Sequence, residues 1–406
     1  MLENKAHSLY DLAQMQSLPL EAKISMSMQR TKVWYQSWTR FEIEDAKTGK
    51  KRFTTIDTRD YNAEPPMKET EYIVSAYDGQ VYVSFSGGKD STVLADICAK
   101  VCQANGWTLY LLFVNTGLEY PEIQKFVKFF AEWLRTTYEI EVVLDIVRPK
   151  MRFDEVLKHY GYPIIGKEVS KIVKEARSAI AKEDYEYYAL KKLQGRAVTK
   201  DGELSAYNCS KWEYLIDAPF DISSQCCDVM KKRPAKKYEK ETLRKPIMGT
   251  LATESRLRRS AWLKSGCNAF EAKRPTSQPL SFWTEQDILH YLKQYNIPYC
   301  SVYGDIQVKP QEEAIEGQIN LIDYLGCYEQ EDMLETTGCD RTGCIFCMFG
   351  CHLEKEPNRF QRLKETHPRQ YEYCIGGGEY VDGKWQPNKE GLGLGRVLDY
   401  IGVKYD

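Results

Sequence analysis

Two kinds of segment alternate between residues 71 and 150 of this 406-residue chain, and this alternation constrains the fold most strongly. Three short apolar runs, VYVSF, LYLLFV and IEVVLDIV, are separated by the helical patterns STVLADICAKVCQ and PEIQKFVKFFAEWLRTTY. Strands that alternate with helices of this length are typical of parallel sheets covered by helices. The sequence therefore predicts an α/β fold built on a doubly wound parallel sheet.

The composition indicates a folded protein of more than one domain. Hydrophobic residues make up 43% of the chain and charged residues 28%, which excludes global disorder. The length suggests two or three domains. A formal net charge of −2 excludes a wholly basic, nucleic-acid-coating protein, although it leaves a local basic patch open.

Three regions surround or interrupt the alternating pattern. Residues 1–70 form an N-terminal extension, in which we expect a helix over 18–35 and a pair of strands over 40–58. The alternating pattern occupies residues 71–305, and we interpret the polar, Lys-rich and Tyr-rich stretch 175–220 as an insertion in it. Residues 306–406 are rich first in cysteine and then in glycine.

A glycine-containing loop follows the first strand of the pattern and precedes the first helix. Glycines allow a tight turn, and the N-terminus of the next helix offers free N–H groups and a positive dipole end. A loop of this kind, with a lysine and hydroxyl groups, predicts a phosphate site. The simpler alternative is an ordinary strand-to-helix turn with a serine N-cap. The loop consists of Ser86, Gly87, Gly88, Lys89, Asp90, Ser91 and Thr92.

The chain contains 13 cysteines, which is a high number for a protein of this length. Its first residues lack the apolar core of a secretory signal, and no stretch approaches the roughly 18 apolar residues of a membrane span. We therefore expect a cytoplasmic, reducing environment without a membrane, where clustered cysteines indicate metal or redox chemistry. Seven cysteines are scattered and expected to pack as small hydrophobic residues: Cys98, Cys102, Cys209, Cys267, Cys300, Cys327 and Cys374.

The glycine loop and several later segments resemble a known family. SGGKDST resembles the pyrophosphate-loop (PP-loop) motif of the adenine nucleotide α-hydrolase superfamily, and in particular the phosphoadenosine phosphosulfate (PAPS) reductase family with its ATP-pyrophosphatase relatives. The match continues in order through NTGLEYPE, GYP, GTLATESR and PLSFWTEQDI to NIPY. Asn115 and Leu251 depart from the family, which usually has Asp and Arg there. The resemblance covers about residues 75–305.

This resemblance implies a Rossmann-like (HUP-type) nucleotide domain over residues 71–305. The loop 86–92 would bind the phosphates of ATP or of the sulfonucleotides PAPS or adenosine phosphosulfate. Lys89, Asp90 and Arg256 would be catalytic, and Glu254 would join Arg256 near the phosphates. The turn formed by Asn115, Thr116 and Gly117 would lie near the adenine or ribose.

Neighbouring residues of these motifs have simpler interpretations. Arg258 and Arg259 could join the phosphate site or lie on a solvated basic helix face. Thr284 is expected as a helix N-cap, with Trp283 packed beneath it.

The remaining cysteines fall into two groups that resemble the iron–sulfur members of the family. Cys226 and Cys227 open a C-C-x-x-x-K-x-x-P pattern, and Cys344 and Cys347 form C-x-x-C. The resemblance implies a [4Fe–4S] cluster; zinc is the alternative, because it also accepts four thiolates, and unligated packing thiols are a third interpretation. Our first choice of ligands is Cys227, Cys344, Cys347 and Cys351, with Cys226 and Cys339 as alternates.

The reaction is left open between two chemistries and one non-catalytic role. Sulfonucleotide reductases carry an E-C-G-x-H-like segment whose cysteine attacks sulfur; this chain lacks it, and Cys374 is the nearest C-terminal thiol. The first chemistry is sulfonucleotide reduction with a thiol reductant protein. The second is ATP pyrophosphatase chemistry, in which a nucleic acid or other acceptor is adenylated and then thiolated by a sulfur donor. The non-catalytic role is nucleotide sensing. The basic stretch 231–245 could contact a nucleic-acid backbone or form a solvated helix.

Overall fold

The computed structural model describes residues 7–60, 63–309 and 332–406, so Cys327 and the rest of 310–331 lie outside the described residues. The chain divides into two compact units, and both are discontinuous in sequence. Unit 1 comprises Met1–Phe113, Tyr120–Val147 and Lys237–Thr342. Unit 2 comprises Val114–Glu119, Arg148–Lys236 and Gly343–Asp406.

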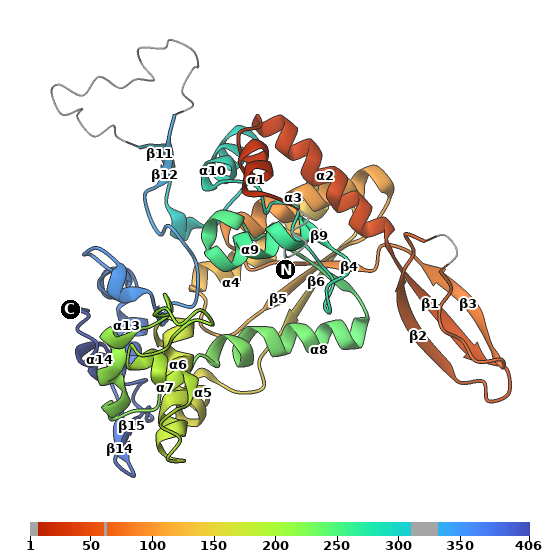
Figure 1. The fold of residues 1–406 in the computed structure, drawn as a ribbon. Coiled ribbons are helices and arrows are strands. Elements are labelled where there is room, and N and C mark those ends of the chain that lie inside the picture. Colours follow the sequence, from red (N-terminus) through yellow and green to blue (C-terminus); the bar gives the residue numbers. More distant parts are fainter. Residues whose placement is uncertain (1–6, 61–62, 310–331) are drawn as a thin grey trace. The chain divides into compact units, whose positions relative to one another are not determined.

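The predicted parallel sheet is confirmed and has six strands (Figure 1). Their order is β6 (Val142–Val147), β5 (Leu109–Val114), β4 (Val81–Ser84), β8 (Lys245–Met248), β10 (Thr276–Ser277) and β9 (Asn268–Ala269). Strand β4 runs parallel to β5 and to β8, and β8 runs parallel to β10, whereas β9 is antiparallel at the edge. The strand order changes direction after β4, as expected for a Rossmann-like sheet, and ligands of such sheets bind beyond the carboxyl ends of the strands.

Helices flank this sheet and carry most of the core. Helix α3 (Lys89–Asn105) buries residues on nearly all sides, including Val93, Leu94 and Ile97. Helix α4 (Pro121–Tyr138) starts at a proline and buries one apolar face, as its amphipathic pattern predicts. The other helical elements of unit 1 are α1 (Leu9–Gln16), α2 (Leu20–Gln36), η3 (Ala252–Glu254), α9 (Arg256–Ser265), α10 (Glu285–Gln294) and η4 (Ser301–Tyr303). Helix α8 (Arg233–Thr242) crosses the boundary between the units.

The predicted architecture around Trp283 is confirmed. Thr284 is the N-cap of α10 and accepts a hydrogen bond from the backbone N–H of Asp287, whose carboxylate bonds back to the cap. The Trp283 indole is fully buried and donates to the Ser27 hydroxyl over 2.9 Å. These residues are structural, because they fix α10 against α2.

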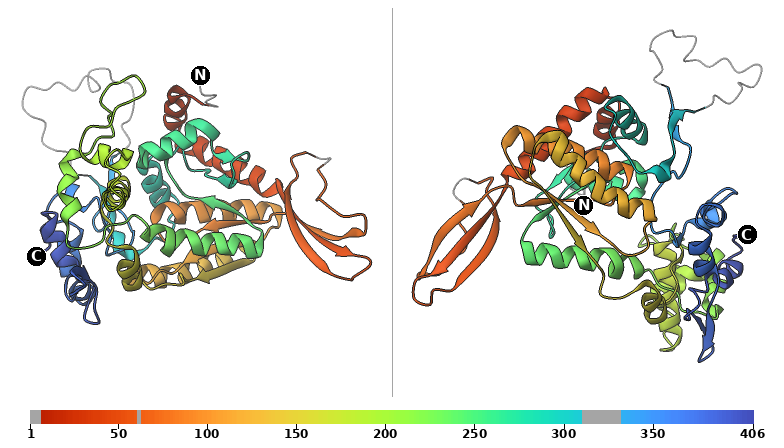
Figure 2. Two further views of the ribbon diagram at one scale, coloured as in Figure 1. Left: turned by 60° about the horizontal axis from the view of Figure 1, so that its bottom comes forward. Right: turned by 180° about the vertical axis from the view of Figure 1, so that it is seen from behind.

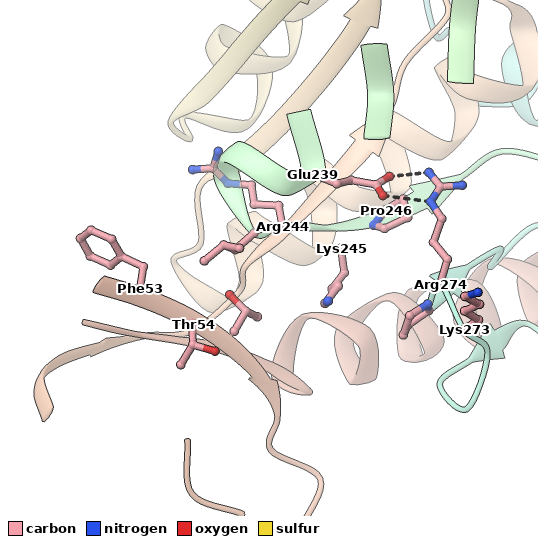
Figure 3. Close-up of a pocket in the computed structure, with 11 residues that line it drawn as sticks. Phe53, Thr54, Glu239, Arg244, Lys245, Pro246, Lys273 and Arg274 are labelled. Carbon is pink, nitrogen blue, oxygen red and sulfur yellow. Dashed lines mark hydrogen bonds and ion pairs between the residues drawn. The ribbon is translucent and has the colours of Figure 1, made fainter. Parts of the chain in front are cut away.

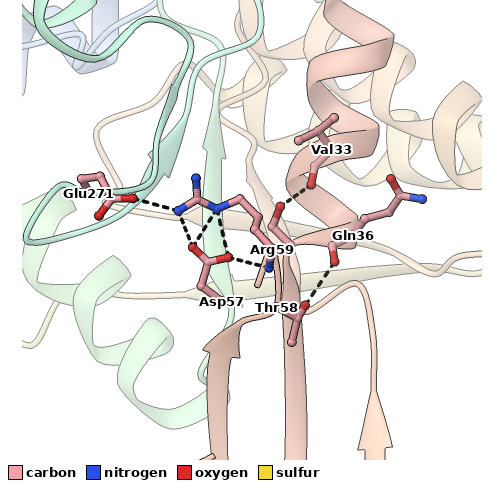
Figure 4. A network of polar contacts seen from close by, with 7 residues as sticks. Val33, Gln36, Asp57, Thr58, Arg59 and Glu271 are labelled. Carbon is pink, nitrogen blue, oxygen red and sulfur yellow. Dashed lines mark hydrogen bonds and ion pairs between the residues drawn. The ribbon is translucent and has the colours of Figure 1, made fainter. Parts of the chain in front are cut away.

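The N-terminal extension contains the predicted helix and the predicted pair of strands. Strands β1 (Trp38–Asp45) and β2 (Lys51–Asp57) are antiparallel, and β3 (Glu71–Tyr77) adds a third strand on the other side of β1 (Figure 2). A polar network fastens the base of this small sheet (Figure 4). Arg59 bridges Asp57 at 2.7 Å and Glu271 at 2.8 Å, and the Thr58 hydroxyl donates to the backbone carbonyl of Gln36.

Unit 2 is mainly helical, with short strands. Glycines in its last segment let two stretches of chain approach closely: a Cβ on Gly391 would lie 2.3 Å from the Gly376 carbonyl oxygen. The interpreted insertion 175–220 contains the end of α6, all of α7 and η1. The elements of unit 2 are α5 (Phe153–Tyr160), β7 (Ile164–Ile165), α6 (Lys167–Ile180), α7 (Tyr188–Leu193), η1 (Ser210–Asp217), η2 (Asp228–Lys232), β13 (Met348–Phe349), η5 (Cys351–Leu353), α12 (Arg359–Thr366), α13 (Pro368–Ile375), β14 (Glu379–Val381), β15 (Lys384–Gln386) and α14 (Leu394–Tyr400).

Two further strands complete unit 1: β11 (Ile306–Val308) pairs with β12 (Leu334–Thr336). Within the described ranges, no helix is both long and apolar enough to cross a membrane.

Candidate nucleotide and cysteine sites

The loop 86–92 connects the central strand β4 to the N-terminus of α3, and glycines determine its path. Gly87 has φ +74°, and a Cβ there would lie 2.9 Å from Cγ2 of Val127. Gly249, just after β8, allows a second close approach, since a Cβ there would lie 2.9 Å from the Asp90 carbonyl oxygen. Both positions require glycine for physical reasons, the first for its backbone conformation and the second for space.

Hydroxyl groups brace the loop from within. The hydroxyls of Ser91 and Thr92 donate to the Gly88 carbonyl over 2.8 and 3.1 Å, and the Ser86 backbone N–H donates to the Ser91 hydroxyl. The helix N-cap is Gly88, which makes no side-chain cap hydrogen bond. The simpler interpretation, a turn capped by serine, therefore does not describe this loop.

Oxygen atoms from other segments of unit 1 accept hydrogen bonds from Lys89 of the loop. The backbone N–H of Lys89 donates to the Tyr303 hydroxyl over 3.1 Å, and that hydroxyl lies 2.7 Å from the hydroxyl of Thr342. The Lys89 side chain is 5% exposed, and its ammonium donates to the carbonyl oxygen of Asp340 and lies 2.7 Å from a carboxylate oxygen of Glu285. Oxygen atoms therefore already occupy positions around the first N–H group and the lysine of α3.

Asp90 is the loop residue whose ionisation is most altered. Burial raises its pKa to about 6, and Glu254 and Glu285 act in the same direction, while the Lys89 ammonium opposes them. Glu254 forms ion pairs with Arg258 and with Arg341, the latter at 3.2 Å. Two acidic and two basic side chains thus surround the loop within unit 1.

The other predicted nucleotide residues have different surroundings. Arg256 is the first residue of α9; it is exposed and makes no side-chain ion pair or hydrogen bond among the described residues. Arg258 contacts Glu254, and Arg259 is exposed. Asn115, Thr116 and Gly117 directly follow β5 and belong to unit 2.

The 115–117 turn is held by its own polar groups. The Thr116 hydroxyl donates to Glu119 over 2.6 Å, and the backbone N–H of Gly117 donates to the Asn115 side-chain oxygen over 3.0 Å. Asn115, which replaces the usual Asp, therefore supports the turn at Gly117, where φ is +75°.

The cysteine groups are brought together inside unit 2 by two backbone contacts. A Cβ on Gly161 would collide with the backbone of Asp221, so this glycine permits the chain to pass closely just before Cys226. Strand β7 pairs in parallel with β13, Ile164 opposite Met348, which holds the C-x-x-C segment that precedes β13.

A π-helix, η2, follows Cys227. Pro234 lacks the N–H that an α-helix would use at this point, which accounts for the wider turn before α8.

Four thiols in this cluster influence one another. The hydrogen bond from Cys226 lowers the pKa of Cys227 to about 6, and the ammonium groups of Lys167 and Lys231 also favour its thiolate. The partner thiol Cys226 has a raised pKa, first because it donates this hydrogen bond and then because it is buried near Cys344 and Cys347. Burial raises the pKa of Cys344 to about 11 and also raises that of Cys347.

Lys231 completes the cluster. Its burial disfavours the ammonium, but the thiol of Cys344 and the carboxylate of Glu119 outweigh this and raise the pKa of Lys231. A buried cation beside several thiols stabilises the thiolate forms that metals require.

The remaining candidate cysteines are not part of this group of four thiols. Cys351 is buried and donates to the Met348 carbonyl over 3.0 Å; burial raises its pKa to about 12, and Cys347 acts in the same direction. Cys339 belongs to unit 1, where its thiol lies 3.7 Å from the Tyr120 hydroxyl. Cys374 is fully buried, and burial raises its pKa well above the usual range. Within the described part of the chain, no three His, Cys, Asp or Glu side chains form a ready metal site.

Sequence reasoning does not place several residues at these two sites; it predicts Glu285, for example, only as an acidic residue in the first turn of a helix. Glu285, Tyr303, Arg341 and Thr342 surround the loop, and Lys167 accompanies Cys227. Their places depend on contacts between segments distant in sequence, so a local pattern does not reveal them. Lys231 is different, since the lysine of C-C-x-x-x-K-x-x-P already marked it.

Comparison with known proteins gives a result at the level of the family. The model of the phosphoadenosine phosphosulfate reductase domain matches residues 80–203 and 200–348, which together are more than half of the chain. A search of the curated proteins finds no match. The match spans β4, the loop 86–92, β8 and the C-x-x-C segment, and it confirms the resemblance drawn from the sequence motifs. The chain therefore belongs to the phosphoadenosine phosphosulfate reductase family, within the adenine nucleotide α-hydrolase-like superfamily.

Proposed function

We propose that the loop 86–92 binds the phosphates of an adenine nucleotide, and that the protein is an enzyme of sulfonucleotide or sulfur-transfer chemistry. The contacts of Lys89 carry this proposal. Its backbone N–H donates to the hydroxyl oxygen of Tyr303, and its ammonium donates to the carbonyl oxygen of Asp340. Phosphate oxygens can take these positions, because a helix N-terminus and a lysine together favour an anion.

Several predicted nucleotide residues have a part in this proposal. Lys89 neutralises phosphate charge, and Arg256, which is exposed and has no carboxylate partner among the described residues, is available to a phosphate oxygen. Asp90 has a pKa near neutrality, which suits a proton acceptor beside the reacting group. Glu254 orients Arg258 and Arg341, with which it forms ion pairs.

Two reactions are compatible with this site. In sulfonucleotide reduction, a cysteine thiolate attacks sulfur and the bond from sulfur to the phosphate oxygen breaks, so the nucleotide leaves. A thiol reductant protein then attacks the modified cysteine, which releases sulfite and leaves a disulfide. In ATP pyrophosphatase chemistry, an acceptor oxygen attacks the α-phosphorus, pyrophosphate leaves, and a sulfur donor then displaces AMP.

One observation favours the second reaction. Cys374, the nearest C-terminal thiol, is fully buried with a raised pKa, which opposes its use as a nucleophile. Adenylation needs no cysteine nucleophile, and the acceptor could be a nucleic acid or a small molecule.

We also propose a metal group on the cysteines of unit 2, a [4Fe–4S] cluster or, alternatively, zinc. The donor chemistry fits, since Cys227, Cys344 and Cys347 influence one another beside two lysines. For the fourth ligand we favour Cys226 over Cys351, because Cys227, Cys344 and Cys347 all raise the pKa of Cys226, whereas Cys347 is the one of these three that acts on Cys351. Such a group would supply electron-transfer or sulfur-carrying chemistry when bound.

Anaerobically purified protein tested with ATP, PAPS and adenosine phosphosulfate distinguishes the reactions. Pyrophosphate from ATP indicates adenylation, sulfite from a sulfonucleotide indicates reduction, and binding without either product indicates a sensor. Lys89→Ala should weaken nucleotide binding about tenfold or more, since hydrogen bonds to charged groups contribute about 1.5–3 kcal/mol. Lys128→Ala, on the exposed face of α4, is the matched control and should leave binding unchanged. Unchanged binding by Lys89→Ala would contradict the proposal.

A further inference from the structure

A basic pocket lies at the edge of the central sheet opposite the loop 86–92. Lys245 opens β8 and pairs with Val81 at the start of the parallel strand β4, whereas the loop follows the end of β4. The pocket has a volume of about 260 Å³, which suits a phosphate group with its waters better than a drug-sized ligand. It is lined by Phe53, Thr54, Thr55, Glu239, Leu243, Arg244, Lys245, Pro246, Lys273, Arg274 and Pro275.

Uncompensated positive charge faces this pocket. Glu239 is its one acidic lining residue, and Arg274 already pairs with that carboxylate through two hydrogen bonds (Figure 3). Arg244, Lys245 and Lys273 form no ion pair within the described ranges of the chain. Figure 3 shows Lys245 projecting between the strand of Thr54 and the segment of Lys273.

Polar atoms of the lining also lack partners. Oγ1 of Thr55 and Nε of Arg244 are buried, and neither has a hydrogen-bond partner in the part of the chain that the structure describes. Buried polar atoms normally have partners, so Oγ1 of Thr55 is available for a ligand. The Arg244 guanidinium is held on the rim of the pocket, since it lies 3.5 Å from the centre of the Tyr110 ring and donates to the Tyr238 hydroxyl. Burial also lowers the pKa of Lys245, an energetic cost that a bound anion would offset.

An aromatic row continues from the pocket over the small sheet. Arg40 lies opposite Thr55 on β2 and opposite Tyr77 on β3. Its guanidinium lies 4.8 Å from the centre of the Phe53 ring and 5.4 Å from that of Tyr77, so the arginine lies between two rings that are 46% and 43% exposed.

Charges elsewhere on this face are balanced. Lys51 pairs with Glu42 at 2.9 Å and with Glu44 at 3.8 Å. At the base of the small sheet, Arg59 pairs with Asp57 and Glu271, so its charge is balanced as well.

We propose that this pocket and the aromatic row bind a single-stranded nucleic acid, with a backbone phosphate in the pocket and a base stacked on Phe53 or Tyr77. Basic grooves combined with exposed aromatic rings are the usual means of holding a strand without reading its sequence. The inference does not depend on which nucleotide the loop 86–92 binds or on the reaction there.

Fluorescence anisotropy of the full chain with labelled 12-nucleotide oligo-dT and oligo-U tests the proposal, at several salt concentrations. Lys245→Gln should weaken binding about tenfold and reduce the salt slope by about one. Phe53→Ala should weaken it about tenfold, with the slope unchanged, because it removes stacking and no charge. Tyr77→Ala is a second aromatic variant, and equal melting temperatures show that each variant is folded.

The matched charge control is Lys128→Gln, on an exposed face of α4. If Lys128→Gln weakens oligonucleotide binding as much as Lys245→Gln does, the effect is a general one of net charge. That result would overturn the proposal. Oligonucleotide binding that neither pocket variant changes overturns it as well. If the protein binds inorganic phosphate but no oligonucleotide, the pocket is a site for small anions. That result would also overturn the proposed binding of a single-stranded nucleic acid.

Discussion

The glycine loop and the cysteine cluster are built in contrasting ways. The loop is one short segment between β4 and α3 with a backbone turn at Gly87, and Gly249 makes one further close approach to it. The cluster combines thiols from two segments more than a hundred residues apart with ammonium groups on Lys167 and Lys231. A site made by local backbone geometry can be recognised in sequence, whereas one made by side chains from distant segments depends on the whole unit.

Replacing a thiol of the cluster should have the largest effect. Cys344→Ser is expected to abolish bound iron and sulfide, or zinc, because a four-thiolate site does not tolerate the loss of one ligand. Nucleotide affinity at the loop should stay within about twofold, because Lys89 and its neighbours are untouched. Iron and sulfide assays on anaerobic protein, together with nucleotide titration, measure both quantities.

Three further serine variants sharpen the choice of ligands. Cys226→Ser should lose the metal and Cys351→Ser should retain most of it, if Cys226 is the fourth ligand. Cys339→Ser is the matched control, because Cys339 belongs to unit 1 and contacts Tyr120. Full metal content in Cys344→Ser would rule out the proposed cluster, and loss in Cys351→Ser alone would restore our first ligand set.

Gly87→Ala should have the next largest effect, on the loop. A left-handed backbone costs an alanine about 1 kcal/mol, and a Cβ 2.9 Å from Val127 adds about 1–3 kcal/mol of overpacking. Unfolding experiments should show a loss of about 2–4 kcal/mol, and nucleotide binding should weaken at least about tenfold because the first N–H groups of α3 move.

The matched control for this glycine is at the other end of the same helix. Gly106 has φ +67°, and nothing lies within 4 Å of a Cβ added there. Gly106→Ala should therefore lose about 1 kcal/mol of stability and no nucleotide affinity. Equal behaviour of the two variants would mean that the close approach at Gly87 has no role.

These differences explain what could be predicted from sequence. The parallel sheet and the glycine loop between β4 and α3 follow from patterns within about 20 residues, and the alternation of strands and helices and the family are confirmed. The surroundings of Lys89 could not be predicted, since Glu285, Tyr303 and Asp340 lie some 200 residues or more further along the chain. The choice between Cys226 and Cys351 likewise depends on how far each thiol lies from the others in the folded unit.

A pH-dependent effect at Asp90 is expected to be intermediate in size. The pKa of Asp90 rises from 3.8 to about 6 on folding, so the folded state binds this proton more tightly than the unfolded chain. The free energy of unfolding therefore falls as pH increases from about 4 to 6 and levels off above. Asp90→Asn does not titrate and should be more stable than the parent at pH 7 by about 1–3 kcal/mol.

Denaturant unfolding of nucleotide-free protein between pH 5 and 8 measures this difference. The advantage of Asp90→Asn should shrink toward pH 5, where the parent carboxyl is protonated. An advantage that is constant over this range would show that burial does not perturb the Asp90 carboxyl.

Tyr303→Phe should have the smallest effect, and it tests whether the oxygen atoms at the loop stand where phosphate binds. The Tyr303 hydroxyl accepts the hydrogen bond of the Lys89 N–H, and burial raises the pKa of this phenol to about 12, so it is neutral in all ordinary buffers. If a phosphate oxygen replaces the phenol, removing the hydroxyl removes a competitor worth about 0.5–1.5 kcal/mol, and nucleotide affinity should rise about two- to tenfold. Calorimetric titration of both proteins measures the change. Tyr295→Phe, on an exposed ring that packs against Tyr291 and Lys100, should leave the affinity unchanged. A weaker affinity of Tyr303→Phe would contradict displacement and would mean that the phenol stays in place and donates to the nucleotide.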